Sequence, residues 1–473
     1  MKWTLMTALA VVAIAGFVPA ASAADYYLRS GTASLTGSGT WEYYNGSSWV
    51  SGTFTPSAGN NYFVDSGATI SGAGTFAGSS LQINAGGKLS MTGSAVVTAL
   101  TLNGGTLAGY ASAASTFTGT VTLTGSSFIE GGNYLVLAPA TMIQGNSAYS
   151  LTYASGKIDI QSNYGGNGWI DENEAVVYSG DTIISAGATV TGFRYRVTTF
   201  GSQKGDLTVD GTLDMGLNVY AKDQNINGLY GSGTITGNAT GRDGAPGLTV
   251  GYGDADGNFS GNIIATAGQT GKLGLTKIGS GTQILSGTNT YTGATTVTLG
   301  ALLINGDSSG AVGVVTVNSG ATLGGSGIIG GATTILSGGK LSPGASAGTL
   351  TIDDSLNISG ALGGAAGSLL FDLGDMVTLT GTNVLTIGSG LLNWDDFVFT
   401  GTVTGPRTYT LFDTGAAISG TLGTNLSGKI GSFDGTLSMS ESGQDILLTV
   451  IPEPATMSLL VLGGLAALIR RRR

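Results

Sequence analysis

The side chains available for chemistry in this sequence are carboxylates, lysine, arginine, tyrosine and serine. The chain of 473 residues contains neither cysteine nor histidine. Their absence excludes a disulfide framework, a thiol nucleophile, a Ser-His-Asp triad and imidazole or thiolate metal ligands. The formal net charge of −10 also argues against a nucleic-acid partner, because phosphate binding requires a basic face. We therefore predict no catalytic residue, no metal site and no cofactor.

Three glycine-rich segments match the residue pattern of catalytic or cofactor-binding motifs but lack the other residues or elements that those motifs need. Residues 306–310 and 344–348 both read Gly-x-Ser-x-Gly, but a nucleophilic serine of that type needs a histidine base. Residues 325–330 have the glycine spacing of a dinucleotide fingerprint, but no helix is expected after them to receive a pyrophosphate. The first two matches are expected by chance in a chain with 84 Gly, and residues 325–330 are predicted to be a corner of the solenoid.

Two acidic segments also have a structural interpretation. Residues 254–258, DADGN, are similar to a calcium loop, but Phe259 and Ala265 stand where an EF-hand requires Gly and Glu. Residues 171–174, DENE, carry acidic side chains without any such spacing. We predict a solvated turn in both places.

The segment 163–243 is the least repetitive part of the chain and the place for an enzymatic alternative. Polysaccharide lyases and glycosidases work with carboxylates, arginine and lysine, so the lack of histidine does not exclude them. No acid pair recurs at a recognisable spacing, but substitution of Arg196, Asp206 or Asp210 would test this alternative. The charged and aromatic residues of the segment include Trp169, Arg194, Tyr195, Arg196, Lys204, Asp206, Asp210, Asp214 and Tyr220.

The first 23 residues have the three parts of a secretory signal peptide. Lys2 precedes an apolar run at residues 5–18, and the small residues Ala21 and Ala23 then stand before Ala24. A signal peptidase needs small residues at these positions, so we predict a signal helix that is cut after Ala23. The alternative is an N-terminal membrane anchor. Signal peptidase and the secretion machinery are the implied partners.

The last 23 residues combine a proline-flanked motif, a short apolar run and a basic end. Pro452, Glu453 and Pro454 precede the apolar residues 455–469 and then four arginines. Arginines hold their end in the cytoplasm, so the proline motif would lie at the outer membrane surface. Fifteen helical residues span about 22 Å, less than a hydrocarbon core of about 30 Å, which suits a transient transmembrane helix.

These three parts resemble the PEP-CTERM sorting signal of Gram-negative bacteria. The resemblance implies that an exosortase-type membrane protease recognises Pro452, Glu453 and Pro454 and cuts beside them. It also implies delivery to the cell surface or the extracellular matrix, with exopolysaccharide as a further partner. The alternative is a tail anchor that is never cut. Without both ends, residues 24–451 carry 13 basic and 27 acidic residues, a net charge of −14.

A short phrase, a glycine turn followed by an aliphatic residue, recurs through the sequence. Its final aliphatics recur at about 18 to 19 residues, which marks a solenoid whose coils bury their apolar edges by stacking. About twenty such coils would make a rod on the order of 100 Å long as an upper bound. The phrases end at Ile70, Leu89, Leu107, Val190, Leu323 and Leu341.

Between these turns, apolar and polar residues alternate with the period of a half-buried strand. In residues 295–299, TTVTL, this period places Val297 and Leu299 inward and the threonines outward. Such outward threonines could order water or carbohydrate, or simply form a solvated face. The predicted fold is all-β: a right-handed parallel β-helix or β-solenoid with terminal caps, an N-terminal signal helix and a C-terminal transmembrane helix.

Residues 275–305 resemble the autotransporter-associated β-strand repeat. They contain its Lys-x-Gly-x-Gly turn, Leu-Ser-Gly, Asn-Thr-Tyr-Thr-Gly and a glycine followed by aliphatics. Residues 258–263 and 321–352 resemble the segments that flank this repeat. Gln283 departs from the family, which usually has an aliphatic residue there, and Ile284 carries the apolar side chain instead. Since a shift by one residue reverses the buried face, the register of this strand is left open.

These observations divide the chain into five parts. We expect a signal peptide at 1–23, an N-terminal cap at 24–60, and a β-solenoid at 61–355 with the repeat at 258–305. A C-terminal solenoid or cap follows at 356–450, and the sorting signal occupies 451–473. The expected function is that of an exported, non-enzymatic surface or matrix protein with a structural or adhesive role. The alternatives are a polysaccharide-active β-helix and a carbohydrate- or ice-binding surface.

Overall fold

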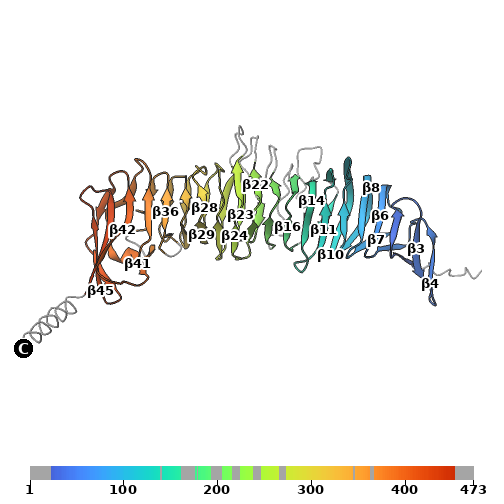
Figure 1. Ribbon diagram of the computed structural model, residues 1–473, viewed down its shortest axis with the longest axis horizontal. Helices are drawn as coiled ribbons and strands as arrows, with labels where there is room; N and C mark the ends of the chain where they lie inside the picture. The colour runs from blue at the N-terminus through green and yellow to red at the C-terminus, as the bar shows by residue number, and fades with distance from the viewer. Residues whose placement is uncertain are drawn as a thin grey trace, which may run out of the picture.

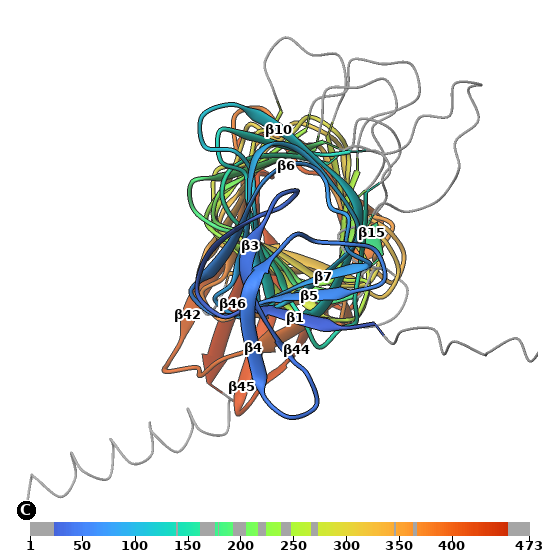
Figure 2. The same cartoon turned by 90° about the vertical axis from the view of Figure 1, so that its right-hand side faces the viewer.

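Successive coils of the chain stack into a long rod, with the N-terminal and C-terminal coils at opposite ends (Figure 1). The computed structural model describes residues 23–138, 141–160, 176–177, 179–192, 205–215, 224–237, 247–265, 273–344, 347–362 and 367–452. Within these residues the secondary structure is β-strand, apart from the 3-10 helix η1 (Trp394–Asp396). Seen along the rod, the coils superimpose as a ring (Figure 2).

Each coil contributes strands in turn to three parallel stacks, which we call faces 1, 2 and 3. Four long strands bend around corners and serve two or three faces: β6 (Ala68–Thr75), β8 (Lys88–Asn103), β10 (Ala114–Gly125) and β14 (Leu151–Ile160).

Face 2 is continuous along the molecule. Beside β6, β8 and β14, its strands are β2 (Gly31–Ser34), β9 (Thr106–Ala108), β11 (Ser127–Glu130), β16 (Thr182–Ile184), β18 (Leu207–Val209), β21 (Leu229–Gly231), β24 (Gly257–Phe259), β27 (Thr282–Leu285), β29 (Gly300–Ile304), β32 (Ala321–Gly325), β35 (Lys340–Pro343), β38 (Leu369–Asp372) and β41 (Phe397–Thr400).

Faces 1 and 3 contain the remaining strands of the coils. Face 1 has parts of β8 and β10 with β1 (Asp25–Leu28), β5 (Asn61–Val64), β7 (Ser80–Asn84), β13 (Met142–Gln144), β15 (Val176–Val177), β20 (Gln224–Ile226), β23 (Gly247–Val250), β26 (Gly274–Lys277), β28 (Thr295–Val297), β31 (Val315–Val317), β34 (Thr333–Ile335), β37 (Leu356–Asn357), β40 (Leu385–Leu392) and β43 (Ser419–Leu422). Face 3 has parts of β6, β8, β10 and β14 with β12 (Tyr134–Leu137), β17 (Ala188–Gly192), β19 (Thr212–Asp214), β22 (Thr234–Gly237), β25 (Asn262–Ala265), β30 (Asp307–Ser308), β33 (Ile328–Ile329), β36 (Thr349–Ile352), β39 (Met376–Leu379) and β42 (Arg407–Thr414).

Antiparallel strands close both ends of the rod. A hairpin of β3 (Gly39–Tyr44) and β4 (Trp49–Phe54) pairs with β1 at the N-terminal end. At the other end, β44 (Ser427–Ile430), β45 (Phe433–Met439) and β46 (Asp445–Pro452) form a meander that pairs with β42. These strands cover edges that an open parallel stack would expose for pairing with other chains.

The recurring phrase is the corner at which the chain enters face 2 at five of its six sites, and at Gly187 it leads into β17 of face 3. Its glycines have φ between +75° and +83°, a left-handed conformation that glycine adopts without a steric penalty. Each stands three residues before its aliphatic, and all six aliphatics are 0% exposed. The prediction of a stacked solenoid is therefore confirmed. These glycines are Gly67, Gly86, Gly104, Gly187, Gly320 and Gly338.

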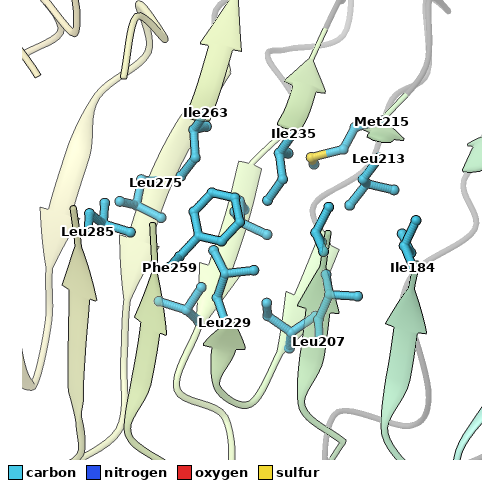
Figure 3. Close-up of a cluster of buried hydrophobic side chains, with 14 of the residues drawn as sticks. Ile184, Leu207, Leu213, Met215, Leu229, Ile235, Phe259, Ile263, Leu275 and Leu285 are labelled. Carbon is cyan, nitrogen blue, oxygen red and sulfur yellow. The ribbon is translucent and has the colours of Figure 1, made fainter. Parts of the chain in front are cut away.

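The core is a continuous column of aliphatic side chains inside the three faces. Figure 3 shows part of it, where Leu207, Leu229 and Phe259 from face 2 meet Leu213, Ile235 and Ile263 from face 3. Every one of these six side chains is at most 1% exposed. Each coil inside the rod buries its apolar side chains against the coils on both sides of it. A single coil would leave these side chains in water, so it is not stable alone.

The rod is shorter than the upper bound from the repeat spacing. Face 2 contains sixteen strands in the described part of the chain, and at about 4.8 Å per strand these span about 70 Å. Coils differ in length because their loops differ: Asp65 bonds to Asn84, 19 residues away, whereas Asp254 bonds to Ser280, 26 residues away. Longer coils reduce the number of coils that the chain can form.

One prediction from the alternation is wrong. Leu299 is 44% exposed, and Thr295 is buried with its hydroxyl hydrogen-bonded to Tyr291. The strand β28 ends at Val297, and the chain then turns, so the period of two does not extend to Leu299. Val297 faces inward and Thr296 faces outward, as predicted.

The register of β27 is regular in spite of Gln283. This residue is 2% exposed and occupies the inward position, while Ile284 faces outward and is half-buried. The one-residue shift that the sequence left open is therefore absent from β27.

No helix among the described residues has the length and apolarity needed to cross a membrane. The predicted signal helix and the predicted transmembrane helix at 455–469 lie outside the described residues.

Candidate functional site

The acidic residues of the enzymatic alternative lie at corners between coils. The Oδ1 of Asp206 accepts a hydrogen bond from the Gly228 amide at 2.9 Å, one coil further on. The Asp206 amide itself donates to Oδ1 of Asp181 at 3.0 Å. Burial raises the pKa of the Asp206 carboxyl, while the bond from Gly228 acts in the opposite direction. The carboxylates at this corner hold one coil to the next.

Asp210 has the same role at the next corner. Its Oδ1 accepts hydrogen bonds from both the amide and the hydroxyl of Ser232, at 3.0 and 3.2 Å. Asp206 and Asp210 therefore lie at opposite ends of β18 and face different corners. Arg196 and residues 171–174 lie outside the described residues, as do Trp169, Arg194, Tyr195, Lys204 and Tyr220. Asp214 lies on β19.

The segment that is similar to a calcium loop is another such corner. Asp254, with φ of +62°, accepts the Ser280 amide at 2.6 Å. Asp256 accepts the Thr282 amide at 2.7 Å. The hydrogen bond from Ser280 lowers the pKa of Asp254 below its usual value. No group of three or more acidic side chains that could hold a metal ion occurs among the residues that the structure describes.

Of the two glycine-serine motifs, residues 306–310 contain the two-residue strand β30 of face 3. Ser308 is 4% exposed, and its hydroxyl accepts a hydrogen bond from the Asn289 amide group at 3.0 Å. A buried and bonded hydroxyl of this kind is not presented to a substrate. Ser346 lies outside the described residues. Residues 325–330 contain the short strand β33, and the next element is the strand β34 rather than a helix.

The most unusual chemistry inside the rod is a group of buried polar residues in the repeat at 275–305. Lys277 is 0% exposed, and its Nζ donates to the carbonyl oxygens of Ile278 and Gly279 at 2.6 and 2.8 Å. It reaches the Leu299 carbonyl in the following coil at 3.3 Å. Burial lowers the pKa of this ammonium group, and the carboxylates of Asp254 and Asp256 act against that shift.

Gln283 bonds across two coils. Its Oε1 accepts the Leu229 amide at 3.1 Å, and its Nε2 donates to the Leu229 carbonyl at 3.0 Å. Gly257 lies between them on β24, and a Cβ there would stand 2.1 Å from the Gln283 Oε1. The missing side chain at Gly257 thus leaves room for the glutamine.

Asn289 connects the coils on either side of it. Its Oδ1 accepts the Ile263 amide at 3.0 Å, and its Nδ2 donates to Ser308 at 3.0 Å. Lys277, Gln283 and Asn289 together bond to backbone groups at strand ends and corners that would otherwise lack a partner in the core. The sequence signal that could have revealed Lys277 is its inward phase, two residues after Leu275.

The two processing signals meet the rod at its ends. Ala24 is half-buried, and its amide donates to Oδ1 of Asn60 at 3.1 Å, while its carbonyl accepts the Asn61 amide at 3.0 Å. Pro452 is the last residue of β46 and lies opposite Phe433. Ala21, Glu453 and Pro454 lie outside the described residues.

Two segments of the chain match known protein families. Residues 275–304 match the family model of the passenger-associated-transport-repeat, and residues 450–473 match that of the PEP-CTERM protein-sorting motif. The chain carries both motifs. The repeat extends from β26 to β29 and so includes Lys277, Gln283 and Asn289.

A similarity also extends to a curated relative. Over 97 residues the chain is 44% identical to the adhesin BmaC autotransporter of Brucella suis biovar 1 (strain 1330). The match covers 20% of this chain and 3% of that protein. It therefore concerns a short piece of a much longer molecule.

Proposed function

We propose that this chain is an exported, non-enzymatic surface or extracellular-matrix protein with a structural and adhesive role. In this proposal the mature protein is a right-handed β-solenoid rod. Before processing, residues 455–469 anchor it transiently in the inner membrane of a Gram-negative bacterium. An exosortase-type protease then recognises Pro452, Glu453 and Pro454. The passenger repeat, the sorting motif and the partial match to an adhesin support this assignment.

One observation carries the proposal: in the part of the chain that the structure describes, the candidate groups for catalysis are already used to join coils. Asp206, Asp210 and Ser308 all bond to neighbouring coils, and Lys277 is buried among carbonyl oxygens. What the molecule presents to its surroundings is a long, stiff surface. A rod that extends away from a membrane is suited to contact other cells or matrix.

Mass spectrometry of the protein from intact cells tests the sorting step. We expect a mature chain that starts at Ala24 and lacks the arginine tail, in the surface or medium fraction. Replacing Pro452, Glu453 and Pro454 with alanine should leave the tail in place and keep the protein in the membrane fraction. A wild-type protein that still ends at Arg473 would contradict processing.

An adhesion assay tests the role itself. A strain without this protein should form less surface-attached biomass, and the gene restored in trans should correct the defect. Activity of the purified protein on a panel of acidic polysaccharides, lost in Asp206→Ala, Asp210→Ala or Arg196→Ala, would instead identify an enzyme.

A further inference from the structure

Four aromatic rings form a solvent-facing surface at the N-terminal end of face 1, which we call the aromatic shelf. Tyr27 stacks on Phe63 with ring centroids 4.8 Å apart, and Trp49 meets Tyr27 edge-on at 5.4 Å. Tyr44 lies 5.6 Å from Trp49. Tyr44 is 55% exposed and Trp49 is 49% exposed. These rings extend from β5 through β1 to the hairpin β3–β4, at the end of the rod nearest the viewer in Figure 2.

The shelf is distinct from the rings that fasten the hairpin to the core. On the opposite side of the same strands, Trp41 is 0% exposed and meets Tyr62 at 5.0 Å. Those buried rings pack the hairpin against the core. Tyr44 and Trp49 are not among them, and an exposed apolar patch of this kind marks a binding surface.

A single arginine holds the shelf in place and is neutralised there. The guanidinium of Arg29 lies 4.2 Å from the Trp49 ring and 5.4 Å from the Tyr27 ring. Its Nε donates to Glu42 at 3.0 Å. These contacts fix the orientation of Trp49 and pair the charge of the arginine. Burial, and then the nearby carboxylates of Asp25 and Asp65, raise the pKa of Tyr27.

The shelf continues along the rod as a column of uncharged polar side chains. In the strand register, Phe63 pairs with Gln82, Gln82 with Thr101 and Thr101 with Thr122, which pairs in turn with Gln144. All of these residues are half-buried on the outer side of face 1. Neighbours in such a column are about 4.8 Å apart.

Hydrogen bonds within the column orient its amide groups. The Nε2 of Gln144 donates to the Thr122 hydroxyl at 2.9 Å, and the Nε2 of Gln82 donates to Asn84 at 2.7 Å. Each carbonyl oxygen of these amides can still accept a hydrogen bond from a ligand. The column therefore presents preorganised acceptors and hydroxyls in a line that starts at the shelf.

We propose that the aromatic shelf and this column bind an uncharged, extended polysaccharide. The C–H face of a pyranose packs on an aromatic ring, whose face is electron-rich, and its hydroxyls bond to amides and threonines. One sugar of an extended chain is close in length to the spacing between strands, so successive sugars can meet successive coils. The ligand is uncharged because residues 24–451 have a net charge of −14, which repels acidic polymers.

This inference rests on the proposed adhesive function and gives it a ligand. Affinity electrophoresis of the purified mature protein tests it, with gels that contain hydroxyethylcellulose, dextran or the acidic polymer alginate. We expect at least one uncharged glucan to slow the wild-type protein and alginate to have no effect. The double variant Tyr44→Ala/Trp49→Ala should weaken binding by about tenfold or more.

Matched variants separate binding from folding. Tyr252→Ala removes an exposed ring on a different corner, where Tyr252 is 39% exposed, and should bind like wild type. Thr122→Val removes a hydroxyl from the column, which lies on the outer side of face 1 and away from the hairpin. It should weaken binding even if Tyr44→Ala/Trp49→Ala misfolds. Circular dichroism and thermal unfolding check each variant.

Three results would overturn the proposal. The first is no retardation of the wild-type protein by either uncharged glucan. The second is equal retardation of wild type and both shelf and column variants. The third is light scattering that shows a dimer broken by Tyr44→Ala/Trp49→Ala with glucan binding unchanged, which would make the shelf a contact between two copies. A strain that adheres normally without the protein would contradict the adhesive role but not the glucan binding itself.

Discussion

Polar residues in the core decide how neighbouring coils fit together. An aliphatic column holds coils by area alone and tolerates sliding, whereas a hydrogen bond to a particular backbone group does not. Gln283 bonds only to Leu229 and to the Ile284 carbonyl, and Asn289 bonds to one coil on each side. These residues therefore determine the register of the stack through the repeat at 275–305.

Gln283→Leu introduces the aliphatic residue that is usual in the repeat family that residues 275–305 resemble. It tests whether Gln283 determines the register of the stack. We expect it to destabilise the protein, because both the amide and the carbonyl of Leu229 would lose their partner in the core. An unsatisfied buried group costs about 1–3 kcal/mol. The measurement is the denaturant midpoint, with Thr282→Val on the outer side of the same strand as control. Equal midpoints for Gln283→Leu and wild type would show that Leu229 needs no partner.

The pKa of Asp206 predicts a pH dependence of stability. Burial raises this pKa above 3.8, so between 3.8 and the folded-state pKa the folded protein binds more protons than the unfolded protein. The contribution of Asp206 to stability therefore falls as the pH rises through this window. Asp206→Asn keeps an acceptor for the Gly228 amide and removes the titration. The difference in unfolding midpoint between wild type and Asp206→Asn should change across the window, and a constant difference would contradict the shift.

At the scale of elements, the C-terminal cap depends on two glycines. Trp394 of η1 lies against β44 and β45, where a Cβ on Gly428 would stand 1.9 Å from its Nε1 and one on Gly435 2.4 Å from its Cη2. The indole thus lies flat on a surface without side chains. This contact fastens the meander of β44, β45 and β46 to the last coil.

Gly428→Ala should loosen this cap. The methyl group would displace Trp394, and overpacking of this kind costs about 1–3 kcal/mol. Gly405→Ala is the matched control, because a Cβ there meets nothing within 4 Å. We expect faster proteolysis after residue 393 in Gly428→Ala than in wild type, and the wild-type rate in the control. Similar cleavage rates would show that the cap does not depend on the tryptophan.

The sequence predicted the corners better than the ends of the strands or the buried polar residues that bond between coils. The turn phrase requires a left-handed glycine and a buried aliphatic, both local properties, so its positions were correct at all six sites. Leu299 was assigned inward because nothing local marks the end of β28 at Val297. Gln283 could not be placed from its own coil, since its partner Leu229 is 54 residues away.

For candidate sites the limit is the same. Asp206 and Asp210 were chosen as residues whose substitution would test for an enzyme, but their partners Gly228 and Ser232 belong to the next coil. Tyr44 and Trp49 belong to the segment 24–60 that the sequence predicts as a cap, but which of its rings face solvent follows from the pairing of β3 with β1. Contacts between coils had to be seen in the structure before these side chains could be interpreted.

For the whole molecule, stability should behave as a sum over coils and their interfaces. Each coil touches mainly its two neighbours, so removing one complete coil brings two equivalent surfaces together. Val315 pairs with Thr333, and Leu323 with Leu341, so residues 315–332 make one such coil. The Asn289 bond to Ser308 lies outside this segment and would survive.

Deletion of residues 315–332 should therefore give a folded rod that is shorter by about one strand spacing, about 4.8 Å. Its circular dichroism should remain that of β-structure, with a slightly lower denaturant midpoint. Deletion of residues 315–323 removes only part of the same coil and leaves the three faces out of phase, so aliphatic side chains would meet solvent. We expect that variant to be degraded during secretion. If the two deletions were equally stable, the coil would not be the unit on which this molecule is built.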